Sequence, residues 1–260
     1  MKLDRVIAVR NKKTIYRDGD RCVKVFNEPY SKSAIFGEAS NLARIEELGL
    51  NTPKLLEVTT VEGKWAIVTE YIKGKTLEQL MMEHPENKSA YFRTLADVQT
   101  NIHGKECTYL YRLKDELNHK INISDLDATT RYDLHHKLEQ LAKGMFICHG
   151  DFCPSNIVLS EDGVYYTLDW ALASYGNPMA DVAQTYIMLW INNSYEDAEL
   201  YLNYYCDESH CDREVVYEWL PIIGGAMSVR RPRNERTALL ECVNSHDFKN
   251  HMKKINFNNK

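Results

Sequence analysis

The chain has 260 residues and a formal net charge of -5, with 44% hydrophobic and 27% charged residues. This length allows a large core in one domain or in two lobes, and the composition excludes disordered and fibrous proteins. Because the net charge is negative and the basic residues are interspersed with acids, nucleic acid is not an expected partner.

Three short apolar segments with strand periodicity open the chain, at residues 6–9, 13–16 and 22–26. Asp18-Gly19, between the last two segments, is a strong hairpin signal. We therefore expect the chain to begin with three antiparallel strands.

The third strand places an ammonium group among apolar neighbours. Strand periodicity puts Lys24 on the same face as Cys22 and Phe26, where a charge costs energy unless an anion meets it. Residues 33–48 have helical spacing, and Glu38 falls on their apolar stripe, which makes it a candidate partner. The alternative is that Lys24 extends to solvent and Glu38 lies at the edge of the stripe.

Two further strands are expected at residues 54–59 and 65–69, and long helical stretches dominate from residue 77 to residue 143. No low-complexity linker or internal repeat separates these parts. We therefore expect two lobes that pack as one unit, residues 1–72 and residues 73–260.

A buried strand at residues 145–148 leads into the polar sequence His149-Gly150-Asp151. Apolar segments at residues 156–159 and 164–168 follow, and they flank Asp162-Gly163, the expected two-residue turn of a hairpin. Asp151 precedes this hairpin on a loop, where a carboxylate can orient an attacking hydroxyl and accept its proton.

The expected hairpin register makes a geometric prediction. Asn156 lies six residues before Asp162, and Asp169 lies six residues after Gly163, so Asn156 and Asp169 should oppose each other directly. Directly opposed side chains have Cβ atoms about 4.5–5.5 Å apart, and two such oxygen donors can share one Mg²⁺. A hydrogen-bonded Asn–Asp pair without metal, or a bulge that breaks the register, is the alternative.

This order of residues resembles the catalytic loop of kinases, which has His-x-Asp, four further residues and Asn, with a metal-binding Asp after the next hairpin. The whole chain resembles the aminoglycoside phosphotransferase and choline kinase-like family of small-molecule kinases. The His-Gly-Asp loop of that family is matched by residues 149–151 and its Asp-Trp motif by residues 169–170. Its Pro-x-x-Asp segment is matched by residues 178–181.

The resemblance implies an α+β, two-lobed protein kinase-like fold. In this family a small N-terminal lobe, an antiparallel sheet with one helix, binds the nucleotide. A larger, mainly helical C-terminal lobe carries the catalytic loop and binds the acceptor. The resemblance further implies ATP as phosphate donor, with GTP as an alternative, and Mg²⁺ as cofactor.

Carried over by motif, Asp151 resembles the catalytic base of the family, and Asn156 and Asp169 resemble its Mg²⁺ ligands. Lys24 resembles the lysine that contacts the α- and β-phosphates, with Glu38 as its salt-bridge partner. These five residues are the predicted catalytic, phosphate-binding and metal-binding groups.

Glu70, Tyr71 and Ile72 correspond to the hinge whose backbone binds adenine in this family. Asp181 is interpreted as structural, because an acid near a helix N-terminus is favoured by the helix dipole in any case. His149 is interpreted as a brace of the loop, since phosphoryl transfer leaves little for a second base to do.

Two departures from protein kinases are present. Residues 10–13 lack glycine where protein kinases have a Gly-rich loop, and Lys12 and Lys13 are interpreted as solvated turn lysines, with a contribution to phosphate binding as the alternative. Residues 169–171 lack Phe-Gly, and a helix is expected to begin by Pro178, which leaves no room for an activation segment. A folded protein substrate is therefore not expected.

The predicted function is transfer of the γ-phosphoryl group of ATP or GTP to a hydroxyl of a small acceptor, an aminoglycoside or a metabolic alcohol such as choline, thiamine or a sugar. Acidic residues at 196–199 and 207–208 suit a polycationic acceptor, but a solvated helix face is the commoner interpretation. A non-catalytic, kinase-like nucleotide-binding protein is the alternative, disfavoured because every catalytic position of the family is filled.

The N-terminus lacks the apolar run of a signal peptide, and no segment reaches the roughly 18 apolar residues of a membrane span. Seven cysteines without a framework spacing are typical of a reducing compartment. We therefore expect a cytoplasmic protein without a membrane or an obligate protein partner. Cys206 and Cys211 are interpreted as ordinary cysteines, since no second cluster supplies the other ligands of a zinc site.

Overall fold

The computed structural model describes residues 3, 5–10, 12–27, 30–229, 231–245, 247–255 and 257. The chain divides into two compact units, one made of Met1–Glu83 and Pro154–Leu172 and the other of His84–Cys153 and Ala173–Lys260. The boundary expected after residue 72 does not coincide with this division. The reason is that the short strand β6 (Gly74–Thr76) pairs with β9 (Ile157–Ser160), which joins the central hairpin to the first unit.

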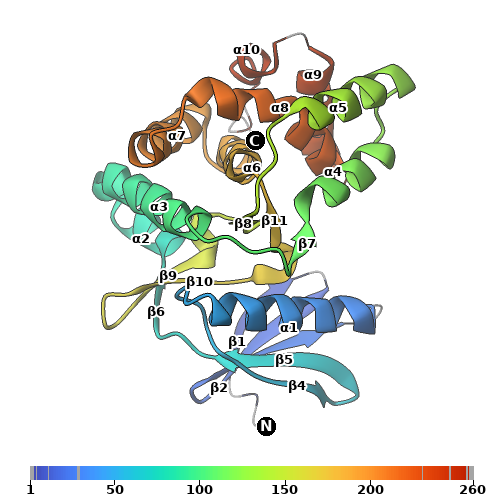
Figure 1. Cartoon of the computed structure of the whole chain (residues 1–260). Coiled ribbons are helices and arrows are strands. Elements are labelled where there is room, and N and C mark those ends of the chain that lie inside the picture. The colour runs from blue at the N-terminus through green and yellow to red at the C-terminus, as the bar shows by residue number, and fades with distance from the viewer. Residues whose placement is uncertain are drawn as a thin grey trace. The chain divides into compact units, whose positions relative to one another are not determined.

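The first unit contains a five-stranded antiparallel sheet with the order β1-β2-β3-β5-β4 (Figure 1). Its strands are β1 (Arg5–Arg10), β2 (Lys13–Asp18), β3 (Arg21–Phe26), β4 (Leu55–Val61) and β5 (Lys64–Glu70). All five agree with the strands expected from hydrophobic periodicity. Gly19, at φ 62°, supplies the left-handed backbone of the turn between β2 and β3.

Helix α1 (Lys32–Glu47) follows the third strand, as predicted. Its first turn is capped by Ser31, whose hydroxyl accepts a hydrogen bond from the N–H of Ala34 at 3.2 Å. Ile35 on the buried face of α1 packs with Phe26 and Ile67 of the sheet in one apolar cluster. Burial of each such side chain stabilises the fold by about 1.5–3 kcal/mol, so this cluster positions α1 on the sheet.

The hairpin of β9 and β10 (Tyr165–Thr167) corrects one prediction. Its loop has three residues, 161–163, rather than two, and Gly163 adopts φ 83°. The register therefore shifts by one, and the N–H of Leu168 donates to the carbonyl of Asn156 at 2.8 Å. The expectation that Asn156 and Asp169 oppose each other directly was wrong.

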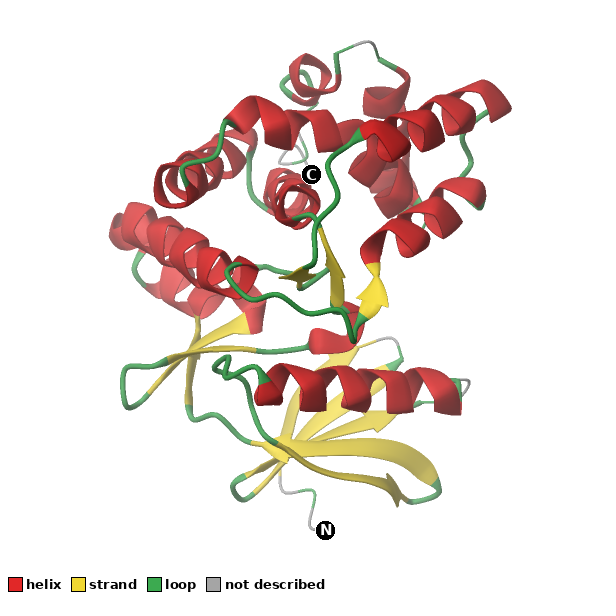
Figure 2. Cartoon of the chain, viewed as in Figure 1, coloured by secondary structure: helices red, strands yellow, loops and turns green. Residues whose placement is uncertain are grey.

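The second unit is mainly helical (Figure 2). Its short sheet has the order β7-β11-β8, with β7 (Tyr111–Arg112), β8 (Phe146–Cys148) and β11 (Ser174–Gly176). Its helices are α3 (Lys88–His103), α4 (Leu113–Asn122), α5 (Ala128–Gln140), α6 (Pro178–Asn192), α7 (Tyr195–Ser209), α8 (Arg213–Ser228), α9 (Arg233–Asn244) and α10 (Phe248–Met252). The short helices η1 (Pro85–Asn87) and α2 (Leu77–Glu83) precede them in the chain.

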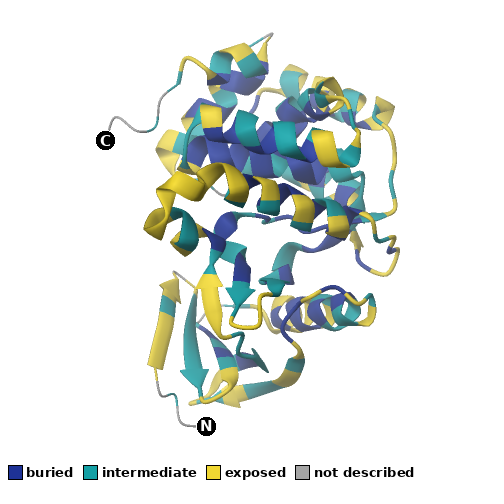
Figure 3. Ribbon diagram, turned by 90° about the vertical axis from the view of Figure 1, so that its left-hand side faces the viewer, coloured by how far each residue is buried: buried dark blue, intermediate teal, exposed yellow. Residues whose placement is uncertain are grey.

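Helix α6 forms the centre of the second unit. It begins at Pro178, as predicted, and Asn177 caps it by accepting a hydrogen bond from the N–H of Met179 at 2.9 Å. Most of its residues are buried, and Figure 3 shows the buried positions of this unit gathered among its helices. None of the helices in the described part of the chain is long and apolar enough to cross a membrane.

Candidate active site

Lys24 on β3 points to two carboxylates. Its Nζ forms a short hydrogen bond with Oε1 of Glu38 on α1, and it lies 3.0 Å from Oδ1 of Asp169. The Lys24 side chain is only 15% exposed. The alternative in which Lys24 extends to solvent is therefore wrong, because the buried ammonium group is paired as the energetics of burial require.

Asp169 receives a second ammonium group. The Nζ of Lys13, on β2, lies 2.9 Å from Oδ2 of Asp169. Burial pushes the pKa of Asp169 upward, but the charges and hydrogen bonds of Lys24 and Lys13 outweigh burial and hold this pKa below its ordinary value. The interpretation of Lys13 as a solvated turn lysine was wrong, and only the tertiary structure reveals this contact.

The same balance acts on Lys24. Burial pushes its pKa downward, but the neighbouring carboxylates of Asp169 and Glu38 outweigh burial and raise this pKa above the ordinary value. Lys24 and Asp169 are thus held in their charged forms at neutral pH. We call Lys13, Lys24, Glu38 and Asp169 the lysine–carboxylate cluster.

The backbone at Asp169 is held by its neighbours. Asp169 adopts φ 62°, a left-handed conformation that costs a residue with a side chain about 1–2 kcal/mol. The indole N–H of the buried Trp170 donates to Oγ1 of Thr52 at 2.9 Å, and the Asn41 side chain donates to the carbonyl of Trp170 at 3.3 Å. These contacts keep the carboxylate directed at the two lysines.

A cavity of about 620 Å³ lies within the first unit, beside the lysine–carboxylate cluster. Its apolar lining includes Ile15, Cys22, Ile67, Val158 and Leu168. Its polar lining includes all four cluster residues and Asn156. The predicted hinge residues Glu70, Tyr71 and Ile72 also line it. Its size and its mixture of an apolar lining with a few charged groups are typical of small-molecule sites.

The segment predicted to be a hinge follows β5 directly. The N–H of Glu70 donates to the carbonyl of Lys54, and the N–H of Tyr71 donates to the carbonyl of Asp20, both at 2.9 Å. Among the described residues, none accepts a hydrogen bond from the N–H of Ile72. This segment is thus anchored to the sheet by two bonds and keeps a donor beside the cavity.

The donors around Asp169 suit Mg²⁺. Asp169 and Asn156 supply a carboxylate and an amide oxygen beside the same cavity, and hard oxygen donors are the ligands that Mg²⁺ prefers. Oε2 of Glu38 is buried and receives no hydrogen bond from the described residues, so the site retains acceptor capacity. The described residues contain no group of three or more His, Cys, Asp or Glu side chains with metal-binding geometry.

The His-Gly-Asp loop belongs to the second unit, where the carboxylate of Asp181 holds it. Oδ2 of Asp181 accepts from the N–H of His149 at 3.0 Å, and Oδ1 accepts from the N–H of Gly150 at 2.8 Å. Nδ1 of His149 in turn accepts from the N–H of Asp151 at 3.1 Å. The geometry supports a bracing part for both His149 and Asp181, and it holds the backbone of Asp151.

Asp181 is itself fixed by residues of α3 that the sequence did not indicate. His103 Nε2 lies 3.1 Å from Oδ2 of Asp181, and the Gln99 side chain donates to the same oxygen at 3.2 Å. Burial pushes the pKa of Asp181 upward, but the hydrogen bond and charge of His103 outweigh it and lower this pKa. His103 Nδ1 lies 2.7 Å from the hydroxyl of Tyr205 on α7. No local pattern identifies these residues, because they are far from the loop in sequence.

The acidic residues of α7 divide into two kinds. Asp197 is buried and pairs with Lys88 at 2.6 Å, and Oε1 of Glu199 accepts from the hydroxyl of Tyr186 at 2.6 Å. The hydroxyls of two further tyrosines, Tyr195 and Tyr217, each lie 3.1 Å from that oxygen. Glu196, Asp207 and Glu208 are exposed, so the expected solvated face holds for these three alone.

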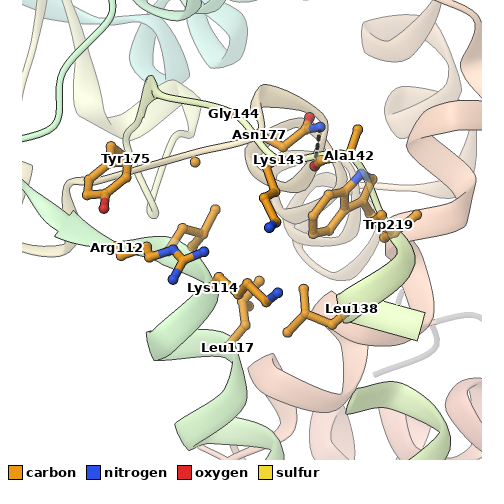
Figure 4. Close-up of a pocket in the computed structure, with 13 residues that line it drawn as sticks. Arg112, Lys114, Leu117, Leu138, Ala142, Lys143, Gly144, Tyr175, Asn177 and Trp219 are labelled. Atoms are coloured by element: carbon orange, nitrogen blue, oxygen red, sulfur yellow. Dashed lines mark hydrogen bonds between the residues drawn. The ribbon is translucent and has the colours of Figure 1, made fainter. Parts of the chain in front are cut away.

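The second unit has a smaller cavity, of about 40 Å³ (Figure 4). Arg112, Lys114 and Lys143 surround it, and Leu138 and Trp219 contribute to its apolar lining. None of the predicted site residues lines this cavity.

The profile of the phosphotransferase enzyme family matches residues 7–219. The chain belongs to this family. This membership confirms the predicted aminoglycoside phosphotransferase and choline kinase-like resemblance. An aminoglycoside 3'-phosphotransferase from Streptomyces ribosidificus is 25% identical to this phosphotransferase-family chain over 144 residues. The alignment covers 48% of this chain and 54% of that enzyme, so the chain spans about half the length of the curated relative that it matches.

Solved structures share the fold of this family member. Choline kinase LicA from Streptococcus pneumoniae aligns with 97% of this chain and 95% of its own, at a TM-score of 0.65 and 17% identity. A thermostable mutant of an aminoglycoside phosphotransferase, in ternary complex with AMP-PNP and hygromycin B, aligns with 96% of this chain and 91% of its own, at a TM-score of 0.64 and 12% identity. The predicted α+β, kinase-like fold is confirmed.

Proposed function

We propose that the protein is a small-molecule kinase that transfers the γ-phosphoryl group of ATP to a hydroxyl group of a small acceptor. The observation that carries this proposal is the lysine–carboxylate cluster beside a cavity of about 620 Å³ that the hinge segment also lines. The ammonium groups of Lys13 and Lys24 suit the binding of phosphates. The apolar lining of the cavity and the backbone N–H of Ile72 suit the binding of a nucleobase. Membership of the phosphotransferase enzyme family supports the same reaction.

The nucleotide is assigned to the cavity of the first unit. Lys24 is the contact to the α- and β-phosphates, held in place by Glu38, and the N–H of Ile72 is the donor to adenine. The apolar side chains Ile67 and Leu168 enclose the base. AMP-PNP in the related aminoglycoside phosphotransferase supports an adenine nucleotide, and GTP remains the alternative donor.

Mg²⁺ is assigned to Asp169 and Asn156. When bound, Mg²⁺ offsets the charge of the phosphates and leaves the γ-phosphorus open to attack. Lys24 and Lys13 add positive charge on the same side, and the ionised Asp169 carboxylate is available for the cation because its pKa is low. The proposal also includes two lobes with different roles. Residues 1–72 bind the nucleotide, and residues 73–260 bind the acceptor.

Asp151 is assigned as the base that orients the acceptor. The hydroxyl oxygen forms a bond to the γ-phosphorus while the bond from that phosphorus to ADP breaks, and the hydroxyl proton passes to the Asp151 carboxylate. The brace formed by Asp181 and His149 supports this assignment, because positioning contributes much of the rate in phosphoryl transfer.

The acceptor is an aminoglycoside or a metabolic alcohol such as choline, thiamine or a sugar. Hygromycin B is bound in one related structure, and a choline kinase is another relative of the same fold. Asp197 already pairs with Lys88, and Glu199 already accepts hydrogen bonds from tyrosine hydroxyls. These two carboxylates are therefore less suited to bind a polycationic acceptor. A cytoplasmic location is proposed with this function.

Phosphoryl transfer from Mg·ATP, and separately from Mg·GTP, to a panel of aminoglycosides, choline, thiamine and sugars tests the proposal, read as added phosphate by mass spectrometry. The control is Asp151→Asn. A phosphorylated product that the control does not form supports the kinase and names its acceptor class. Nucleotide binding without any product across the panel would favour the non-catalytic alternative.

A further inference from the structure

Two cysteines of the second unit lie in contact at the end of α7. Cys206 is in the last turn of the helix and Cys211 lies just beyond it, and their Sγ atoms are 3.5 Å apart. His210 adopts the left-handed conformation, φ 54°, which turns the chain back and brings the second sulfur to the first. Both cysteines are free thiols and only half-buried, so small reagents can reach them.

The two sulfurs differ in acidity. The hydrogen bond with Cys206 lowers the pKa of Cys211 to about 6, and burial only partly opposes this effect. The same hydrogen bond, followed by burial, raises the pKa of Cys206. A thiolate is the nucleophilic form of cysteine, so Cys211 is the reactive member of the pair and Cys206 is the thiol beside it. By contrast, burial raises the pKa of Cys22, Cys148 and Cys242.

We propose that Cys206 and Cys211 form a redox-modification site, in which a hydroperoxide converts the two thiols into a reversible disulfide. The thiolate of Cys211 attacks the terminal peroxide oxygen, the O–O bond breaks, and the alcohol leaves after protonation. The sulfenic acid formed on Cys211 is then attacked by the sulfur of Cys206. The S–S bond forms, the S–O bond breaks, and water leaves with the proton of Cys206. The peroxide gains two electrons and the cysteine pair loses two.

The geometry requires a small movement. A disulfide has an S–S distance of about 2.05 Å, so the sulfurs must approach by about 1.5 Å from their present 3.5 Å. Only four residues separate them, and the second lies on a loop. Rotation of the side chains and a shift of the loop can supply this movement without unfolding α7.

The site also has a connection to the His-Gly-Asp loop. Tyr205, directly before Cys206, contacts His103 with its hydroxyl at 2.7 Å, and His103 contacts Asp181 at 3.1 Å. Asp181 accepts the hydrogen bonds from His149 and Gly150. A covalent bridge at the next residue of α7 therefore acts on the end of a hydrogen-bond chain that holds this loop.

The test uses the full-length, fully reduced protein treated with tert-butyl hydroperoxide. Peptide mapping without reduction should show a bridge between Cys206 and Cys211, removed by dithiothreitol. At neutral pH the thiolate fraction rises about 30-fold between pKa values of 8.5 and 6, while intrinsic nucleophilicity falls about tenfold. The reaction of Cys211 should therefore be about two- to threefold faster than that of an ordinary cysteine.

Variants separate the two parts of the reaction. Cys206→Ser should react at Cys211 but stop at the sulfenic acid, which dimedone labels, whereas Cys211→Ser should lose the fast reaction. Cys22→Ser is the matched control and should keep it, because Cys22 is another half-buried cysteine with a raised pKa. Oxidation without a bridge, or an equally fast reaction in Cys211→Ser, would overturn the proposal.

Hydrogen exchange measures the connection to the loop without an activity assay. In the oxidised protein the amides of His149 and Gly150 should exchange faster than in the reduced protein, while amides of α1 should not change. Unchanged exchange at the loop would overturn the connection. This result does not depend on the proposed kinase reaction, so its failure is distinguishable from a failure of that function.

Discussion

Lys13 and Asp169 are 156 positions apart in the sequence, yet the ammonium nitrogen of the first lies 2.9 Å from a carboxylate oxygen of the second. Residues 10–13, which end at Lys13, contain no glycine, so this chain lacks the Gly-rich loop that covers the phosphates in protein kinases. The contact of Lys13 with Asp169 instead brings positive charge to the place where the phosphates are proposed to bind.

Lys13→Met should weaken nucleotide binding. Removing one charge-assisted hydrogen bond costs about 1.5–3 kcal/mol, which corresponds to a rise of about tenfold or more in the KM for Mg·ATP. Lys12→Met is the matched control, because Lys12 is an exposed lysine directly beside Lys13 in the sequence. An equal effect of both changes would show that Lys13 acts only through general charge.

Lys24→Met should both weaken nucleotide use and destabilise the first unit. It leaves the buried Glu38 carboxylate without its ammonium partner, and breaking a buried pair from one side costs about 3–5 kcal/mol. Denaturant unfolding measures the loss. The double change Lys24→Met with Glu38→Gln should recover part of the stability but none of the nucleotide binding. A double variant no more stable than the single one would contradict the pairing.

Asp151→Asn should abolish turnover and spare nucleotide binding. General-base catalysis contributes about 10²–10⁴-fold, so kcat should fall by at least about 100-fold while the Kd for ATP changes little. Asp133→Asn, at an exposed position of α5, is the control and should retain activity. Wild-type turnover in Asp151→Asn would show that another group is the base.

Acid should destabilise the protein partly through Asp169. The lysines hold the pKa of Asp169 below its value in the unfolded chain, so the folded protein releases this proton more readily. The resulting stabilisation is fully present above the unfolded pKa, near 3.9, and is lost as pH falls towards the folded pKa. The unfolding free energy of wild type should therefore fall more steeply below about pH 4 than that of Asp169→Asn. Parallel curves would exclude this contribution.

Asp181→Ala should loosen the His-Gly-Asp loop. It leaves the buried N–H groups of His149 and Gly150 without their acceptor, at about 1–3 kcal/mol for each group. We expect a lower unfolding free energy and a lower kcat, with the KM for ATP nearly unchanged. Asp181→Asn, which keeps one carbonyl oxygen, should be milder in both respects. A change confined to the KM for ATP would contradict a positioning part for Asp181.

Much of this protein follows from local pattern. Strand periodicity placed Lys24 on a buried face, and helix periodicity placed Glu38 on the stripe that faces the sheet. Both signals depend on neighbours within a few residues, and the energetics of a buried charge then require the two groups to meet. The His-Gly-Asp and Asp-Trp motifs likewise identified the family, because each is a short stretch whose spacing is set by one loop or one hairpin.

The tertiary structure decided what depends on exact register and on distant partners. The hairpin loop has three residues instead of two, and that single residue moved Leu168 into the place opposite Asn156. Lys13 was interpreted as a solvated turn lysine, because the residues near it in the sequence do not indicate its contact with Asp169. His103 supports the loop from α3, and hydrogen bonds of this kind arise only when helices pack. Local sequence thus determines which faces are buried, whereas packing determines which side chains meet across them.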